Sequence, residues 1–181
     1  MKQLSDLFER RDISGLSKGA LVDELSKAGH EAGYTIEEVN KEKPWGAYVR
    51  FSSMNAEAFL NEFFPSLNFN QARLGREDVE LSPKILLVAP GQRLSWQYHF
   101  RRAERWKFLT DGSFNKSDTD VEGEDFKAKA GDEIQFRPEE RHRLIGHPEG
   151  YVIVAEIWQH TKPGQLSDED DIIRLSDDYR R

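Results

Sequence analysis

Four side chains in the second half of the sequence have types and spacing that could serve a metal-dependent reaction. Gln97 and His99 lie two residues apart in the run 94–99, and side chains two apart in a strand point to the same face. Glu104 comes five residues after His99, which leaves enough chain for a turn to bring its carboxylate back beside that histidine. His142 follows about forty residues later, in what we expect to be another strand.

The absence of cysteine narrows the chemistry that these residues could perform. A sequence with no cysteine has no disulfide, no thiolate zinc site and no cysteine nucleophile, so a metal must be held by imidazole, carboxylate or amide groups. A single histidine in a strand is more often an ordinary hydrogen-bonded group, and a buried glutamate near arginine is usually half of an ion pair. We favour the metal interpretation for the four residues together, and expect ordinary surface positions for His30, His147 and His160.

The elements that must position these side chains are predicted to be short strands. From Lys84 onward, short apolar runs are separated by glycine, proline and aspartate, a texture typical of a β-sandwich or barrel. We therefore expect a mainly β fold. The runs that predict strands are residues 85–88, 94–99, 106–109, 133–136 and 152–158.

The first forty residues have a different pattern. Apolar residues recur at helical spacing over residues 1–40, which predicts an N-terminal helical extension. Ser5 and Ser17 are candidate N-caps, and Gly29 or Gly33 would suit a helix end. This arm could act as a lid or a dimerisation element, or it could simply pack on the outside of the barrel.

Residues 41–181 are predicted to form the barrel itself. A turn and strand are expected over 43–51, a short helix over 55–64, and a polar loop over 68–83. The acidic run 168–171 is most simply a solvated cap to the last segment.

Composition limits the class of partner. The chain has 181 residues and a formal net charge of −7, with a local basic patch at Arg101, Arg102, Arg105 and Lys107. One domain of ordinary size is expected, and the patch suits a small anionic ligand better than nucleic acid. No segment has the length and apolarity of a membrane span or a secretion signal, so we expect no membrane partner and a cytoplasmic location.

Four segments, in the right order, resemble a known family. The chain is similar to the cupin superfamily, and in particular to the C-terminal cupin domain of type II mannose-6-phosphate isomerases. This resemblance covers roughly residues 43–181 and implies a double-stranded β-helix, or jelly-roll barrel. The segments that carry it are residues 43–46, 90–106, 131–144 and 169–179.

The resemblance also implies a ligand set. Carried over position by position, it places a divalent cation on Gln97, His99, Glu104 and His142. One amide, two imidazoles and one carboxylate suit zinc, with manganese, cobalt or nickel as alternatives, and leave the ion able to act as a Lewis acid.

Two positions depart from the family pattern. Phe100 stands where these isomerases usually carry another histidine, and because neighbouring side chains in a strand alternate, it should face away from Gln97 and His99. Glu139 stands where the second motif usually has glycine, which makes that turn the weaker part of the match.

The implied activity is aldose–ketose isomerisation of a sugar phosphate through an enediol. Mannose 6-phosphate, or a related substrate such as a heptose phosphate, is the expected substrate. Catalytic roles are predicted for Glu156 as the base, for Lys84 as a weaker candidate base, and for Arg102, which matches the arginine of the isomerase motif. Each also has an ordinary interpretation as an ion-pair partner, and Arg102 could simply neutralise Glu104.

Substrate contacts are predicted for Arg101, Arg143 and Trp45, since guanidinium groups pair with phosphate and the indole could line the cleft. A homodimer is expected, because exposed barrel edges invite partners. Two other functions stay open: a cupin that binds carbohydrate or metal without turnover, and a metal-dependent oxygenase, which Gln97 disfavours because iron cupins usually keep histidine there.

Overall fold

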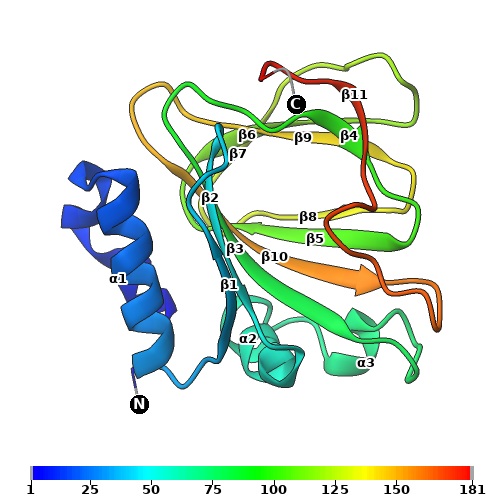
Figure 1. The fold of residues 1–181 in the computed structure, drawn as a ribbon, viewed down its shortest axis with the longest axis horizontal. Coiled ribbons are helices and arrows are strands. Elements are labelled where there is room, and N and C mark those ends of the chain that lie inside the picture. The colour runs from blue at the N-terminus through cyan, green and yellow to red at the C-terminus, as the bar shows by residue number, and fades with distance from the viewer. Residues whose placement is uncertain (1, 180–181) are drawn as a thin grey trace.

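Two antiparallel sheets face each other and enclose the interior of the molecule (Figure 1). The computed structural model describes residues 2–179. Sheet A consists, in spatial order, of β1 (Ile36–Asn40), β2 (Gly46–Phe51), β3 (Leu81–Val88), β10 (Val152–His160), β5 (Arg102–Phe108) and β8 (Glu133–Phe136). Sheet B consists of β11 (Ile173–Ser176), β4 (Trp96–Tyr98), β9 (Arg141–Ile145), β6 (Gly112–Ser117) and β7 (Phe126–Ala128). The prediction of a mainly β jelly roll is confirmed.

Strand β10 lies at the centre of sheet A and is buried along its whole length. Its alternate residues serve two different cores, as the two-residue period of a strand requires. Val152 and Val154 belong to the cluster between the sheets, whereas Ile153 and Ile157 pack with the helices on the outer face. The face of β10 that points between the sheets therefore also carries Glu156 and Trp158 inward.

The N-terminal arm packs on the outer face of sheet A (Figure 1). It contains two 3-10 helices, η1 (Ser5–Glu9) and η2 (Arg11–Gly15), and one α-helix, α1 (Lys18–Glu31). Ser17 caps α1 by accepting a hydrogen bond from the amide of Ala20, and Gly33, with φ of 86°, follows its end. Ser5 does not cap a helix: it is the first residue of η1, the N-cap position is Leu4, and η1 has no side-chain capping hydrogen bond.

The arm is shorter than the predicted extension. Residues Ile36–Asn40 form strand β1, which pairs with β2 at the edge of sheet A. Ile36 packs against the outer-face cluster whereas Val39 is exposed, and both are β-branched, which favours a strand. A division at residue 40 stays a proposal, as does any role of the arm beyond packing.

Two further helical segments lie at one end of sheet A. The predicted short helix is present as α2 (Ala56–Phe63), preceded by η3 (Ser53–Asn55). The stretch predicted as loop contains α3 (Phe69–Ala72), whose start is closed by reciprocal hydrogen bonds between Asn68 and Gln71. This capping pair was the signal for a helical turn that the polar composition hid.

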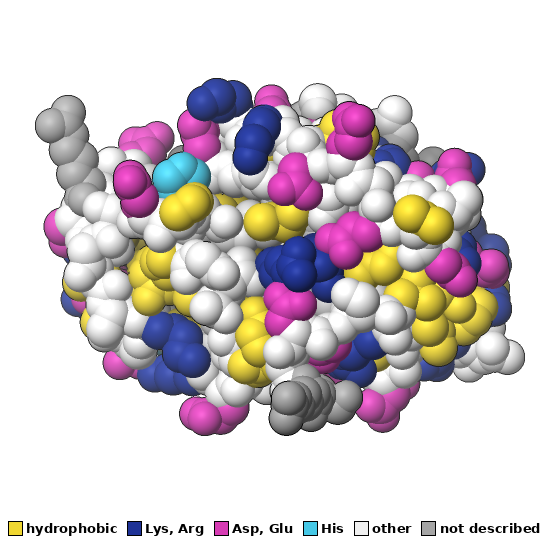
Figure 2. Space-filling view, turned by 90° about the horizontal axis from the view of Figure 1, so that it is seen from above, with side chains coloured by type: hydrophobic (Ala, Val, Ile, Leu, Met, Phe, Trp, Pro, Cys, Tyr) yellow, Lys and Arg dark blue, Asp and Glu magenta, His cyan; other side chains and the backbone are white. Residues whose placement is uncertain are grey.

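The surface mixes both signs of charge. On the face shown in Figure 2, lysine and arginine side chains are interspersed with aspartate and glutamate, and hydrophobic groups lie between them in several places. In the part of the chain that the structure describes, no helix has the length and apolarity needed to cross a bilayer.

Candidate metal centre and adjoining pocket

Three of the four predicted ligands meet between the two sheets. One ligand atom from each of His99, Glu104 and His142 lies within 4.8 Å of the others, and all three residues are buried. His142 is on β9 and His99 directly follows β4, both from sheet B, whereas Glu104 is on β5 of sheet A. The turn between β4 and β5 therefore crosses from one sheet to the other and places the carboxylate opposite the imidazoles.

Both imidazoles are oriented by backbone carbonyls. His99 Nδ1 donates to the carbonyl of Asp171 at 2.6 Å, and His142 Nδ1 donates to that of Glu140 at 2.9 Å. Each Nε2 then carries a lone pair: that of His142 faces Glu104 Oε2, whereas that of His99 accepts from Arg102 Nη2 at 3.2 Å. Metal-binding histidines in proteins are commonly held in this way, by a hydrogen bond to the nitrogen that does not coordinate.

Two buried atoms at this point have no hydrogen-bond partner among the described residues. They are Glu104 Oε2 and His142 Nε2, which lie 3.3 Å apart without the alignment of a hydrogen bond. Leaving such atoms unsatisfied is costly. A cation between them would satisfy both, so the residues present fit a divalent metal ion.

Gln97 lies beside this cluster, in register with His142 across β4 and β9. Its Oε1 accepts a hydrogen bond from Ser95 Oγ at 2.6 Å, and both side chains are buried. One lone pair of the amide oxygen is left for a further interaction. Gln97 is thus placed to be the fourth ligand, which stays a proposal.

Arg102 also reaches the cluster. Its Nε donates to Glu104 Oε1 at 2.7 Å, and its Nη2 lies 3.2 Å from His99 Nε2. The guanidinium stacks on Trp158, 3.7 Å from the ring centroid. Arg102 therefore neutralises Glu104 from the side away from His142, the ordinary role that the sequence left open.

These contacts set the protonation states. Burial, assisted by the positive charge of Arg102, lowers the pKa of His99 to about 4. Burial alone would raise the pKa of Glu104, but its contacts with His99, Arg102 and His142 outweigh burial and hold that pKa well below its usual value. A neutral His99 beside an ionised Glu104 is the state in which such groups bind metals.

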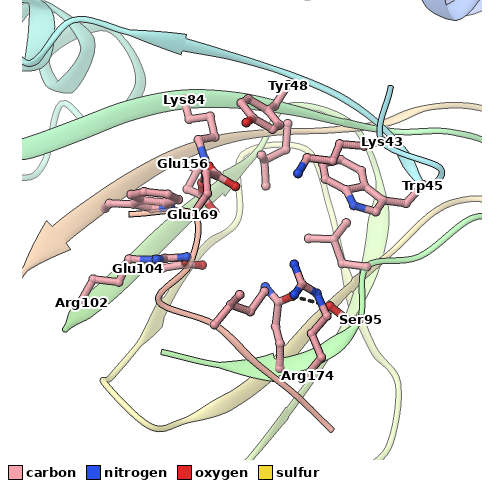
Figure 3. Close-up of a pocket in the computed structure, with 15 residues that line it drawn as sticks. Lys43, Trp45, Tyr48, Lys84, Ser95, Arg102, Glu104, Glu156, Glu169 and Arg174 are labelled. Carbon is pink, nitrogen blue, oxygen red and sulfur yellow. Dashed lines mark hydrogen bonds and ion pairs between the residues drawn. The ribbon is translucent and has the colours of Figure 1, made fainter. Parts of the chain in front are cut away.

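A pocket adjoins the cluster (Figure 3), and its water-accessible space is about 50 Å³, room for a few water molecules. Polar side chains form much of its wall, and Gln97 and Glu104 connect it to the cluster of His99, Glu104 and His142. The other lining residues are Lys43, Trp45, Tyr48, Lys84, Leu86, Leu94, Ser95, Arg102, Glu156, Trp158, Glu169, Ile172 and Arg174.

Glu156 and Lys84 are both buried in the pocket wall. Glu156 Oε1 accepts from Trp106 Nε1 at 2.9 Å, while Lys84 Nζ lies 3.9 Å from Glu156 Oε2 and 2.7 Å from Glu169 Oε1. Burial, and after it the negative charge of Glu104, raises the pKa of Glu156 to about 8. Glu156 can thus exchange a proton near neutral pH, and Lys84 forms the ion pairs that its alternative interpretation expected.

Of the three predicted substrate-binding residues, one lies at the pocket and two do not. Trp45 lines the pocket. Arg101 instead donates to the Leu166 carbonyl and to Asp168, and Arg143 to Glu122 and Ser176. Neither arginine is among the described residues that line the pocket, because these partners hold their guanidinium groups away from it.

Three charged residues that line the pocket were missed by the sequence interpretation: Lys43, Glu169 and Arg174. Within residues 2–179, the Arg174 side chain makes no hydrogen bond or ion pair, and it lies across the pocket from Lys84 (Figure 3). Arg174 is in register with Gln97 across β11 and β4. The signal was available, because Lys43 and Arg174 lie in two of the segments that carry the family resemblance.

Two other expectations are corrected. His160 is buried rather than on the surface, and it contacts Ser82 Oγ at 3.0 Å and the Ser167 amide at 2.9 Å. The acidic run is not simply solvated, since Asp171 is buried and Glu169 lines the pocket. His30 and His147 are exposed as expected, and Phe100 faces solvent, away from the cluster.

The sheets and the buried centre define a cupin. Residues 75–177 match the family described as "Mannose-6-phosphate isomerase C-terminal". This is more than half of the 181 residues, so the chain belongs to that family. Comparison with curated proteins finds no match.

One solved structure supports the fold. The capsular polysaccharide assembling protein CapF from Staphylococcus aureus has a TM-score of 0.51 and 10% identity, over 80% of this chain and 35% of CapF. A Cupin 2 conserved barrel domain protein from Salinispora arenicola has a TM-score of 0.39 and 20% identity, over 46% of this chain and 66% of that one. A cupin protein from Bacteroides fragilis has a TM-score of 0.39 and 17% identity, over 49% and 70%. The chain thus spans about a third of the length of CapF, and at 10% identity that match speaks to fold alone.

Proposed function

We propose that this protein is a metal-dependent sugar-phosphate isomerase that interconverts an aldose and a ketose. The observation that carries the proposal is the buried group of His99, Glu104 and His142, which opens onto a pocket containing a second, protonatable carboxylate, Glu156. Membership of the family supports the choice of mannose 6-phosphate, or a related aldose phosphate, as substrate. The native ion is proposed to be zinc, with manganese, cobalt or nickel as alternatives.

The chemistry divides between the ion and the chain. An ion on these ligands would supply Lewis-acid polarisation of the substrate's C1 and C2 oxygens. Glu156, when ionised, removes the proton from C2 of the aldose and returns it to C1, while the hydroxyl proton moves from O2 to O1 and an enediol forms between the two steps. Trp106 holds Glu156 in place through its indole N–H.

The phosphate is proposed to bind at the pocket mouth. The space inside is about 50 Å³, less than a hexose phosphate needs, so the far end of such a substrate must lie at the rim. Arg174 is exposed and Lys43 half-buried, and both line the pocket. Arg174 and Lys43 would thus take the phosphate-binding role that was predicted for Arg101 and Arg143. A guanidinium group can donate two parallel hydrogen bonds to a phosphate.

The experiment compares wild-type protein, loaded with Zn²⁺, Mn²⁺, Co²⁺ or Ni²⁺, with the same protein after chelation. Each sample is incubated with mannose 6-phosphate, sedoheptulose 7-phosphate and free mannose, and the product ketose or aldose is measured. We expect turnover of a phosphorylated sugar only with metal, and its loss in His142→Ala.

Three outcomes are informative. Metal binding without turnover of any sugar would contradict the isomerase and favour the cupin that binds without catalysis. Failure of wild-type protein to bind any of these ions would remove the proposal altogether. Oxygen uptake by the iron-loaded protein, followed with an electrode, tests the oxygenase alternative.

A further inference from the structure

The segment before β11 reaches the metal centre from outside. The carbonyl oxygen of Asp171 accepts the 2.6 Å hydrogen bond from His99 Nδ1. This bond leaves the Nε2 lone pair of His99 on the side of Glu104, 3.1 Å from Oε1. The position of one residue, more than seventy residues further along the chain, thus determines how a proposed ligand is oriented.

The Asp171 side chain fixes that position. Its Oδ1 accepts from the amide of Phe100 and its Oδ2 from the amide of Arg101, both at 3.0 Å, and the carboxylate is buried. These two amides belong to the turn that directly follows His99. Asp171 therefore holds His99 twice, by its carbonyl at the ring and by its carboxylate at the backbone.

Ser167 extends the same network to the arginine. Its hydroxyl donates to Asp171 Oδ2 at 2.6 Å and accepts from Arg102 Nη1 at 2.6 Å. Arg102 in turn binds Glu104 Oε1. Two of the three clustered ligands, His99 and Glu104, are thus connected through buried hydrogen bonds to residues 167–171.

We propose that Asp171 is a positioning residue of the metal centre, which orients His99 for coordination by holding the β4–β5 turn and the His99 ring together. The inference rests on the proposed metal site but goes beyond its ligands. A carboxylate serves here because each of its oxygens has lone pairs for several donors, whereas asparagine offers only one accepting oxygen for the Phe100, Arg101 and Ser167 donors.

The test uses Asp171→Asn, with Asp170→Asn as the matched control. Asp170 is the neighbouring residue, is exposed, and undergoes the same chemical change. Co²⁺ affinity of the full chain is measured by competition with a chromophoric chelator, and the Co²⁺ absorption bands report ligand geometry. We expect Asp171→Asn to bind Co²⁺ about 10- to 100-fold more weakly with altered bands, and Asp170→Asn to match wild type.

A second readout needs no metal. In wild-type apoprotein, the His99 Nδ1–H proton should be protected from exchange by its bond to Asp171, and His99→Gln identifies its NMR signal. We expect Asp171→Asn to speed its exchange with water. Ser167→Ala, which removes one of the three donors to Asp171, should give a smaller change in both measurements and covers the case in which Asp171→Asn fails to fold.

The outcomes separate this inference from the proposed function. If Asp171→Asn and Ser167→Ala lower only the melting temperature, with unchanged Co²⁺ affinity and unchanged His99 exchange, Asp171 is merely structural and the inference is wrong. If wild-type protein itself binds no Co²⁺, the proposal of a metal site at these residues is wrong. If Co²⁺ affinity responds as expected but no sugar is converted, the positioning role stands and the isomerase does not.

Discussion

Glu104 divides its two carboxylate oxygens between different partners. Oε1 receives Arg102 and faces His99, whereas Oε2 faces His142 and has no hydrogen bond among the described residues. One oxygen is therefore neutralised by the protein, and the other keeps its lone pairs. Because of this asymmetry, a cation would interact most favourably with Oε2, whose negative charge is not already neutralised by Arg102.

Replacing Glu156 tests the proposed proton transfer. Glu156→Gln keeps the size of the side chain but removes the group that carries the proton. We expect kcat to fall about 10²- to 10⁴-fold, the usual contribution of a general base, with Co²⁺ affinity within a few-fold of wild type. Steady-state rates and metal titration measure the two effects, and an unchanged kcat would assign the proton to another residue.

Replacing Arg174 tests the proposed phosphate site. Arg174→Ala should raise KM for a phosphorylated substrate by about tenfold or more, in line with the 1.5–3 kcal/mol of a charge-assisted hydrogen bond. Arg137→Ala, which removes an exposed arginine elsewhere, is the matched control. Competition by inorganic phosphate provides a second measurement, and equal inhibition constants in wild type and Arg174→Ala would place the phosphate elsewhere.

How far the sequence predicts the site depends on distance along the chain. Gln97 and His99 share a strand region, so the two-residue period was enough to group them. Arg101 and Arg143 could be placed near the centre but not oriented, because their guanidinium groups reach Asp168 and Glu122, partners that only the tertiary fold brings close.

Among the elements, the turn before β9 shows how the family motif survives without its glycine. Glu139 has φ of 63°, in the left-handed region that glycine favours. Its amide still donates to the His99 carbonyl at 2.7 Å. The turn at the weaker part of the family match therefore has the backbone that a glycine would adopt.

The Glu139 backbone predicts an order of stability. Glu139→Val should lower the free energy of unfolding by about 1–2 kcal/mol, because a β-branched residue tolerates positive φ poorly. Glu139→Gly should leave it unchanged or raise it slightly. Urea unfolding of the three proteins measures this order, and a valine variant as stable as the glycine variant would show that the turn adopts another conformation in solution.

The end of β10 predicts a pH dependence. His160 is neutral, since its Nδ1 accepts from the Ser167 amide. Burial, and after it the charges of Arg102 and Arg101, lowers its pKa to about 4, whereas an unfolded histidine titrates near 6.5. As pH falls from about 6.5 to about 4, the unfolded chain takes up this proton first, so the free energy of unfolding decreases by up to about 1.4 kcal/mol per pH unit.

Urea unfolding of metal-free protein between pH 7 and pH 4.5 checks this dependence, with His160→Gln beside wild type. The variant should lose stability less steeply in the same range, although His99 titrates in both proteins. Parallel curves for the two proteins would mean that His160 is already protonated in the folded state or is solvated.

Element prediction failed where local pattern and tertiary context disagree. Residues 36–40 follow a helix closely enough to be grouped with it, yet pairing with β2 makes them a strand. The acidic run was expected to be solvated because aspartates usually are. Asp171 is nevertheless buried, since its carboxylate accepts hydrogen bonds from the amides of Phe100 and Arg101. The strand β10 was predicted correctly, because its run of apolar, mostly β-branched residues favours a buried strand in both the local sequence and the folded protein.

At the scale of the whole molecule, the N-terminal arm belongs to the same hydrophobic cluster as the outer face of sheet A. Leu25→Ala, which truncates a fully buried side chain of α1, should lower the free energy of unfolding by about 2–5 kcal/mol. Lys27→Ala, on the exposed side of the same helix, should change it by about 0.5 kcal/mol or less. Denaturant unfolding measures both, and equal effects would mean that the arm does not pack on the barrel in solution.

The centre joins two layers that otherwise meet mainly through apolar packing. Glu104 comes from sheet A, and His99 and His142 come from the sheet B side. A bound ion would therefore be a cross-link between the layers as well as a reagent, and its binding free energy would add to the cohesion of the barrel. Loss of the ion would then loosen the geometry on which its own recapture depends.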